Sequence, residues 1–327
     1  MVWVDQDKGL QFLANIHDWL FQSWIFNELD PDYRVALASI LHAVWPGTDT
    51  EKKYSYIPLP SLCGHALGKV SPSTTAVNAA WVLLFVASYI LDKLEDEEVQ
   101  HPIFSKYSPG VVMNLTTGLI LHSGRILAEL GPLDVSDKLL LEIRREFHQQ
   151  ALSVCAGQHH DLTIKEPDFE QVWKIVDAKS GKFFALGAYL GARLATNDHE
   201  KVALFSEIGR RLGIINQINN DLGGLGSREE TGSDLAFGRR TLPVQYALMV
   251  LPPEKYAMLV EYLHNAVQDP SAELKARQMI LSAGAVIYLS LEAAKHRQQA
   301  STMLESLHLP SDQSLPLHNL LKHSIRL

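Results

Sequence analysis

The chain has 327 residues, of which 46% are hydrophobic, and its formal net charge at pH 7 is −8. An acidic surface argues against nucleic-acid binding, since phosphate backbones are bound by basic surfaces. Two cysteines, Cys63 and Cys155, are too few for a disulfide framework or a zinc-binding set, which favours a reducing, cytoplasmic location.

The first segment, MVWVDQDKGL, has no pattern typical of a signal peptide. Helical periodicity dominates the rest of the chain. Apolar residues recur at spacings of three and four, which predicts helices over 10–25, 169–195, 199–221 and 274–307. The stretch Ala76–Leu91 contains Asn78 and is shorter than a membrane span, so it predicts a buried helix and no transmembrane segment. We expect one all-α domain over residues 1–327, with helix N-termini near the prolines at 71–74 and 252–254.

An acidic run ends the apolar helix, because residues 92–98 have the sequence DKLEDEE. A helix C-terminus carries a partial negative charge, so acids at this end are mildly repelled. Asp92, Glu95 and Asp96 are spaced i, i+3 and i+4, which puts them on one helix face. Carboxylates on one face can bind Mg²⁺, an ion that prefers oxygen ligands. A solvated acidic helix end is the alternative.

Polar groups recur in the segments 156–167 and 177–184. A zinc site at His159 and His160 is disfavoured, because adjacent histidines point in different directions on a helix and no other His or Cys lies at ligand spacing. Lys179 and Lys182 are either surface lysines with apolar stems against the protein or ligands of a diphosphate.

A second cluster lies in the segment 215–243. A predicted helix ends in Asn219, Asn220 and Asp221 and is followed by glycines and by the basic pair 239–240. Such a helix end suits an anionic ligand held through a metal. An ordinary helix C-terminus followed by a loop is the alternative.

Taken in order, these segments resemble the trans-prenyltransferases, the polyprenyl diphosphate synthase family of all-α isoprenoid enzymes. The resemblance covers residues from about 75 to 250. It implies a helical bundle with a central prenyl-binding cavity, Mg²⁺ as cofactor, an allylic prenyl diphosphate as substrate, and a homodimer. The motifs that carry it are the acidic run at 92–98, Gly157-Gln158 with Asp161, Lys179-Ser180, Gln217-Ile218 before Asn220-Asp221, Ser233-Asp234-Leu235, Gly238-Arg239 and Thr241-Leu242-Pro243.

The resemblance also implies roles for the matching residues. Those with catalytic roles would be Asp92, Asp96, Lys179, Gln217 and Asp221. Those that bind substrate would be Gln158, Asp161, Ser180, Asn220 and Arg239. Mg²⁺ would be held by Asp92, Glu95, Asp96 and Asp221. The wall of the prenyl pocket would be formed by residues on turns before Asp92, which are Ser88, Ala87, Phe85, Leu84 and Trp81.

The depth of this pocket can be estimated from helix geometry. Trp81 lies about 16 Å before Asp92 at 1.5 Å per residue, and it is expected to form the floor. The expected prenyl chain therefore has roughly fifteen to twenty-five carbons. A tryptophan that packs in the core and lines no pocket is the alternative.

Several positions depart from the family pattern. Each aspartate-rich motif should contain Asp-Asp-x-x-Asp, but this chain has Asp92-Lys93 with Asp96, and then Asn220-Asp221 with Gly224. Lys93 is expected to weaken metal binding, because an ammonium repels Mg²⁺. Basic residues that would bind isopentenyl diphosphate are missing. Arg34 is the nearest candidate for the basic residues expected near the N-terminus. The sequence EEVQHP stands where the family has an arginine pair after the first acidic motif. Arg228 is the nearest substitute for the lysine expected in the loop before Ser233-Asp234.

Three functions follow from these departures. The favoured one is a prenyltransferase whose acceptor is isopentenyl diphosphate or an uncharged group such as a peptide side chain. Within the family, DKLEDEE, GQHHDLT and ILHAVWPG most resemble the peptide-pheromone prenyltransferases of competence quorum sensing. A class I terpene cyclase would use Asn220, Asp221 and Gly224, and its cavity would be lined by Trp81, Phe85, Phe183 and Phe184. A catalytically impaired partner subunit is the third possibility, and Lys93 supports it.

Overall fold

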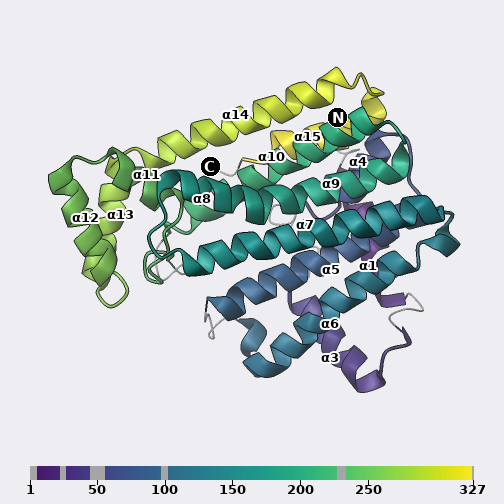
Figure 1. The fold of residues 1–327 in the computed structure, drawn as a ribbon, viewed down its shortest axis with the longest axis horizontal. Coiled ribbons are helices and arrows are strands. Elements are labelled where there is room, and N and C mark those ends of the chain that lie inside the picture. Colours follow the sequence, from purple (N-terminus) through teal and green to yellow (C-terminus); the bar gives the residue numbers. More distant parts are fainter. Residues whose placement is uncertain (1–5, 23–26, 45–55, 97–101, 227–232, 326–327) are drawn as a thin grey trace. The chain divides into compact units, whose positions relative to one another are not determined.

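The computed structural model describes residues 6–22, 27–44, 56–96, 102–226 and 233–325, and in these ranges it contains helices and no β-strand. The predicted all-α class is therefore confirmed (Figure 1). The chain divides into two compact units, each assembled from several segments. Unit 1 comprises Met1–Gln149, Leu186–Ser206 and Leu307–Leu320, and unit 2 comprises Gln150–Ala185, Glu207–Ser306 and Leu321–Leu327. The single-domain expectation stays a prediction.

Unit 1 is organised around α5 (Pro72–Glu95), which lies beside α6 (Pro109–Ala128) in Figure 1. The helix begins as the sequence predicts, because Ser71 caps it by accepting a hydrogen bond from the Thr74 N–H and Pro72 occupies its first turn. α5 also packs against α1 (Gln6–Gln22) and α4 (Leu59–Ala66). The other elements that lie wholly in unit 1 are α3 (Pro31–Val44), η1 (Pro102–Phe104) and η2 (Gly131–Leu133).

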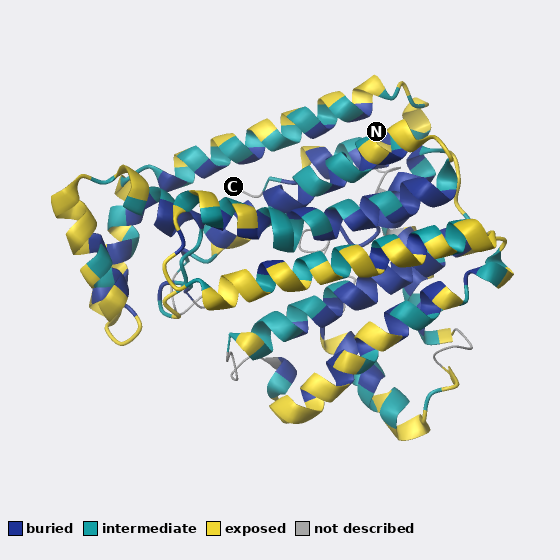
Figure 2. Ribbon diagram, in the orientation of Figure 1, coloured by how far each residue is buried: buried dark blue, intermediate teal, exposed yellow. Residues whose placement is uncertain are grey.

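Every residue from Ala76 to Leu84 on α5 is buried, and the corresponding stretch of the helix is dark blue in Figure 2. Asn78 is tolerated in this core because both polar atoms of its side chain are hydrogen-bonded to the segment around α4. It accepts bonds from the Ser61 N–H (3.0 Å) and hydroxyl (2.8 Å) and donates to the Ile57 carbonyl (2.9 Å). By length and composition α5 and α6 are apolar enough to cross a membrane, but 72% of the α5 window is buried inside the protein.

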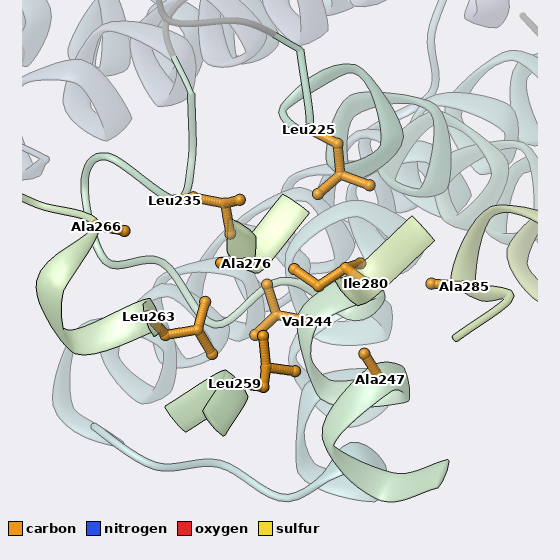
Figure 3. Packing of buried hydrophobic residues seen from close by; sticks show 10 residues of the cluster. All are labelled: Leu225, Leu235, Val244, Ala247, Leu259, Leu263, Ala266, Ala276, Ile280 and Ala285. Atoms are coloured by element: carbon orange, nitrogen blue, oxygen red, sulfur yellow. The ribbon is translucent and has the colours of Figure 1, made fainter. Parts of the chain in front are cut away.

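Unit 2 contains an apolar cluster formed by α11 (Leu242–Val250), α12 (Pro253–Asn265), α13 (Pro270–Ser282) and the loops near them. Figure 3 shows its side chains, among them Leu235, Val244, Leu259 and Ile280, converging from these elements. The other elements that lie wholly in unit 2 are α8 (Phe169–Val176), the π-helical η3 (Asp177–Gly181) and α14 (Ala285–Ser306). Four of the five boundaries between the units fall within helices, namely α7 (Asp137–Thr163), α9 (Lys182–Ala195), α10 (His199–Gly223) and α15 (Ser311–Lys322), and the fifth follows the end of α14.

Two predicted helices differ from the structure. The expected helix over 169–195 is present, but a π-helical turn at Asp177–Gly181 interrupts its α-helical geometry. The expected helix over 274–307 is wrong, because the chain breaks between α13 and α14 at Gly284, whose φ of +83° is the left-handed conformation that ends helices. The helix expected over 199–221 is confirmed as α10, and residues 23–25 of the first predicted helix lie outside the described residues.

Candidate functional site

The acidic run stands at the C-terminal end of α5, as the sequence predicts. The helix ends at Glu95, and Asp96 is its C-cap residue, whose N–H donates to the Asp92 carbonyl at 3.0 Å. Asp92 and Asp96 are half-buried, whereas Glu95 is exposed. The two half-buried carboxyl groups therefore stand one helical turn apart at the end of a buried apolar helix.

Lys93 lies beside one of these carboxylates. Its Nζ is 3.9 Å from Asp92 Oδ2 and 5.7 Å from the centre of the Tyr89 ring, and its side chain is largely buried. An ammonium at this position would repel a cation bound to Asp92. Residues 97–101, which continue the acidic run, lie outside the described residues.

The described residues contain no group of three His, Cys, Asp or Glu side chains arranged as a metal site. Mg²⁺, however, is usually held by one or two carboxylates together with phosphate oxygens and water. Asp92 and Asp96 fit this mode, because they supply two oxygen-donor groups that are only partly covered.

One face of α5 opens towards its acidic end. The first partly exposed residues on this face after the buried stretch are Phe85, Ser88, Tyr89 and Asp92, which are spaced three or four residues apart. Trp81, one turn before Phe85, has no exposed surface. Its ring packs against Gly187, where a Cβ would lie 2.8 Å from the indole, and lies 6.1 Å from the Phe85 ring. The partly exposed face therefore ends between Phe85 and Trp81.

Unit 2 brings together the residues of three other motifs. Lys179 and Ser180 stand on the π-helical turn η3. Lys179 Nζ donates to Asp161 Oδ2 on α7 at 2.5 Å. The Ser180 hydroxyl donates to Gln217 Oε1 on α10 at 2.7 Å. Segments separated by 18 and 37 positions in the chain therefore meet around this turn.

A chain of hydrogen bonds continues from Gln217 to the start of α11. Gln217 Nε2 donates to Asp221 Oδ1 at 2.7 Å, and the Leu242 N–H donates to Asp221 Oδ2 at 2.9 Å. Both carboxylate oxygens of Asp221 thus accept bonds from the protein, and its side chain is buried. Asp221 caps the first turn of α11, a role that sequence spacing did not indicate.

The electrostatic surroundings of Asp221 favour its protonated form. Burial raises the pKa of its carboxyl to about 7, and the charges of Asp234 and Asp161 act in the same direction. The hydrogen bonds from the Leu242 N–H and Gln217 oppose this change. Metal binding at Asp221 stays a prediction, and it would require lone pairs other than the two already engaged.

The stability of the ligand-free protein is expected to depend on the titration of Asp221. Because the pKa is higher in the folded than in the unfolded chain, the folded state holds the extra proton between the two values. The contribution of Asp221 to the free energy of unfolding should therefore fall by a few kcal/mol as pH rises from about 4 to about 7 and then level off. His122 and His296 contribute in the opposite direction over this range, because burial lowers their pKa to about 4. In Mg²⁺-free denaturation the difference in unfolding free energy between wild type and Asp221→Asn should isolate this fall, whereas the difference between wild type and the exposed Asp312→Asn should stay constant with pH. An identical slope in wild type and Asp221→Asn would contradict this assignment.

Arg239 does not stand free for a ligand, since its Nη1 donates to Asp234 Oδ1 at 2.8 Å. Asp234 in turn packs against Gly224, where a Cβ would lie 1.8 Å from its carboxylate oxygen. The Gly224 that departs from the family's aspartate thus makes room for Asp234. Sequence reasoning placed Asp234 in a motif but gave it no role.

The remaining predicted residues are less informative. Gln158 is half-buried on α7, and Asn220 is exposed near the end of α10. Arg34, the candidate for a missing basic residue, donates to the Asn27 carbonyl and side chain. Arg228 lies outside the described residues.

Comparison with known proteins gives these sites a context. The sequence model of the polyprenyl synthetase family matches residues 65–280. The tryptophan prenyltransferase ComQ of Bacillus subtilis is 25% identical over 242 residues, which cover 73% of this chain and 77% of that protein. The short chain isoprenyl diphosphate synthase of Methanocaldococcus jannaschii is 24% identical over 244 residues, covering 72% and 73% of the two chains.

Solved structures show the same fold at low sequence identity. A polyprenyl synthetase from Streptomyces coelicolor A3(2) aligns with a TM-score of 0.81 and 20% identity over 97% of this chain and 98% of that one. A decaprenyl diphosphate synthase from Rhodobacter capsulatus aligns with a TM-score of 0.82 and 18% identity over 98% and 100%. The isoprenoid synthase fold expected from the resemblance is confirmed. Because the family model also matches most of the chain, the protein belongs to the polyprenyl synthetase family, as its motifs predicted.

Proposed function

We propose that the protein is a Mg²⁺-dependent prenyltransferase that acts on an allylic prenyl diphosphate. The observation that carries the proposal is the end of α5, where Asp92 and Asp96 stand half-buried above a partly exposed face that closes at Phe85. Such a helix offers oxygen ligands at one end and an apolar wall below them. Membership of the polyprenyl synthetase family supports the same assignment.

Asp92 and Asp96 would hold Mg²⁺, with Glu95 as a further candidate, and Asp221 is the candidate for a further ion. When bound, Mg²⁺ neutralises diphosphate charge and so favours departure of the leaving group. The allylic C–O bond breaks, and diphosphate leaves with the electron pair. The acceptor π-electrons then form the new C–C bond, and the acceptor loses a proton. The departing diphosphate would be stabilised by hydrogen bonds from Lys179, Ser180 and Arg239 and by the positive charges of the two basic residues. Arg239 would release its hydrogen bond to Asp234 and donate to the diphosphate instead.

We propose an uncharged acceptor, and a tryptophan side chain is the favoured example. The basic residues that would neutralise a second diphosphate are missing from the sequence, and a second polyanion would be poorly held without them. A relative that covers most of this chain is named as a tryptophan prenyltransferase. Isopentenyl diphosphate is the alternative acceptor.

Incubation with Mg²⁺ and farnesyl or geranylgeranyl diphosphate tests the acceptor directly. Three parallel reactions would contain a tryptophan-containing peptide, isopentenyl diphosphate or no acceptor. We expect a prenylated peptide by mass spectrometry in the first reaction only. Formation of an elongated diphosphate in the second reaction would show that isopentenyl diphosphate, and not the peptide, is the acceptor. A hydrocarbon or alcohol formed without acceptor would indicate a cyclase. Turnover of no substrate would favour a non-catalytic partner subunit.

Lys93 is expected to weaken Mg²⁺ binding in this reaction. Its ammonium lies 3.9 Å from Asp92 Oδ2, where its charge opposes that of a metal ion. Lys93→Asp should lower the Mg²⁺ concentration for half-maximal diphosphate binding by about tenfold, measured by calorimetry with a non-hydrolysable diphosphate analogue. Lys93→Met removes the charge at similar length and should give an intermediate value. A higher Mg²⁺ requirement in both variants would show that Lys93 contacts the diphosphate itself.

We propose a location in the cytoplasm, in line with the two cysteines of the chain. We also propose a homodimer that forms through α6. From Pro109 to Gly124 this helix has no charged residue, yet it exposes a set of apolar side chains. Those with the largest exposure are Val111, Met113, Ile120 and Leu121. An uncharged exposed helix face of this length is typical of a self-complementary interface.

Substitution within this face should dissociate the dimer. Leu121→Asp, at a residue 70% exposed, should yield monomer in sedimentation equilibrium, because it buries an unpaired charge in the interface. Leu291→Asp is the matched control, since Leu291 is 65% exposed on α14. A wild-type monomer at micromolar concentration, or a dimer that persists in Leu121→Asp, would rule out this interface.

A further inference from the structure

The helix that carries Lys179 and Ser180 contains one π-helical turn. The Lys182 N–H donates to the Asp177 carbonyl, five residues earlier, instead of following the α-helical pattern. A π turn places an extra residue in one turn, so side chains beyond it are rotated by about 100° relative to a continuous α-helix. Such turns are uncommon and are frequently found at functional sites. Both Lys179 and Ser180 stand within the turn.

Two neighbouring helices leave room for this turn by means of glycines. A Cβ on Gly213 of α10 would lie 2.2 Å from the Ser180 carbonyl oxygen. A Cβ on Gly157 of α7 would lie 2.7 Å from the Ala178 side chain and 3.1 Å from the Lys179 nitrogen. The backbone of the turn thus packs closely against α7 and α10. A side chain in place of either glycine would clash with the turn.

An ion pair holds the turn at its first residue. Arg210 Nε on α10 donates to Asp177 Oδ1 at 2.6 Å, and Arg210 Nη1 also donates to Glu207 at 3.2 Å. The Asp177 carboxylate folds back over the turn, so that a Cβ on Gly181 would lie 2.6 Å from Oδ1. Asp177 therefore closes the π turn with its carbonyl and anchors it to α10 with its side chain.

The pair is separate from the contacts made by the two proposed ligand-binding residues. Lys179 bonds to Asp161 on α7, and Ser180 bonds to Gln217 one helical turn beyond Gly213 on α10. Without a fixed π turn, neither side chain would be held towards its present partner. A charge-assisted pair at the first residue is well placed to fix the turn, because such bonds are short and directional.

We propose that Asp177 and Arg210 are positioning residues, whose ion pair holds the π turn and so presents Lys179 and Ser180 to the diphosphate. The part of this inference that concerns diphosphate rests on the proposed function. The anchoring of the turn does not, because it is a property of the ligand-free chain. The two parts can therefore be tested separately.

Hydrogen–deuterium exchange tests the anchoring. Asp177→Asn and Arg210→Gln should each increase exchange in peptides that cover 177–186 by about tenfold, while peptides from α13 stay unchanged. Glu170→Gln is the matched control, because it removes an exposed ion pair with Lys174 on the preceding turns of the same helix. Equal exchange at 177–186 in all three variants and wild type would overturn the proposal.

Kinetics with an allylic diphosphate then test the positioning. In both pair variants kcat should fall by about tenfold or more with a smaller change in KM, because misplaced groups lose contacts made as diphosphate departs. Arg210→Lys retains the charge and should recover part of the rate, and Glu170→Gln should match wild type. Faster exchange with unchanged kcat would overturn the positioning role. A wild type inactive towards every prenyl diphosphate would refute the proposed function and leave the exchange result to decide on the anchoring.

Discussion

Replacement of both Asp92 and Asp96 by alanine is expected to abolish prenyl transfer while the protein stays folded. The two carboxyl groups stand at the half-buried end of α5 and belong to no apolar cluster, so their removal leaves the core intact. Loss of the metal would remove several kcal/mol of charge stabilisation from the transition state, which corresponds to about a thousandfold loss in rate or more.

The measurement is the rate of diphosphate release from farnesyl diphosphate, together with thermal unfolding of each variant. Glu261→Ala is a suitable control, because it removes one exposed carboxylate from α12. We expect the control to keep wild-type activity and the double variant to keep the wild-type melting temperature. Wild-type turnover in the double variant would refute both the transferase and the cyclase assignments.

Trp81→Ala is expected to lengthen the prenyl chain that the enzyme accepts. The partly exposed face of α5 ends at Phe85, and Trp81 fills the next layer with a fully buried ring. If this ring closes the pocket, its removal opens space below, and longer diphosphates should gain in kcat/KM relative to farnesyl diphosphate. The substitution should also destabilise the protein by about 3–5 kcal/mol, as is typical for a buried tryptophan.

A second tryptophan separates these two effects. Trp173 is partly buried on α8 and packs against Phe169, with ring centres 6.1 Å apart. Trp173→Ala should therefore destabilise the protein without altering its preference among prenyl diphosphates of different length. A folded Trp81→Ala protein with the wild-type preference would show that Trp81 has only a packing role.

Local sequence signals predicted the ends of two helices. Ser71 and Pro72 mark the start of α5, and the polar cluster at 219–221 marks the last turns of α10. The acidic run was placed correctly at the end of α5, because a long apolar stretch followed by charge leaves little choice. These features depend on residues close together in the chain, which is why the sequence reveals them.

Features that depend on tertiary contacts were not predictable in this way. The π turn at Asp177 relies on glycines at 157 and 213, and nothing in the segment itself indicates it. Metal binding by Asp221 stays a prediction, but its hydrogen bond from the Leu242 N–H, 21 positions later, depends on the fold and has no local sequence signal. The break at Gly284 was missed because the apolar periodicity continues on both sides of it.

The most direct test of the proposed function is Mg²⁺-dependent release of diphosphate from an allylic prenyl diphosphate by purified protein, with a tryptophan-containing peptide present. Release should require Mg²⁺, disappear in the Asp92→Ala, Asp96→Ala variant and equal the amount of prenylated peptide. Release that is unaffected by chelation of Mg²⁺ would contradict the proposed function. So would the absence of release from wild type with allylic diphosphates of roughly fifteen to twenty-five carbons, the range expected from the length of the α5 face.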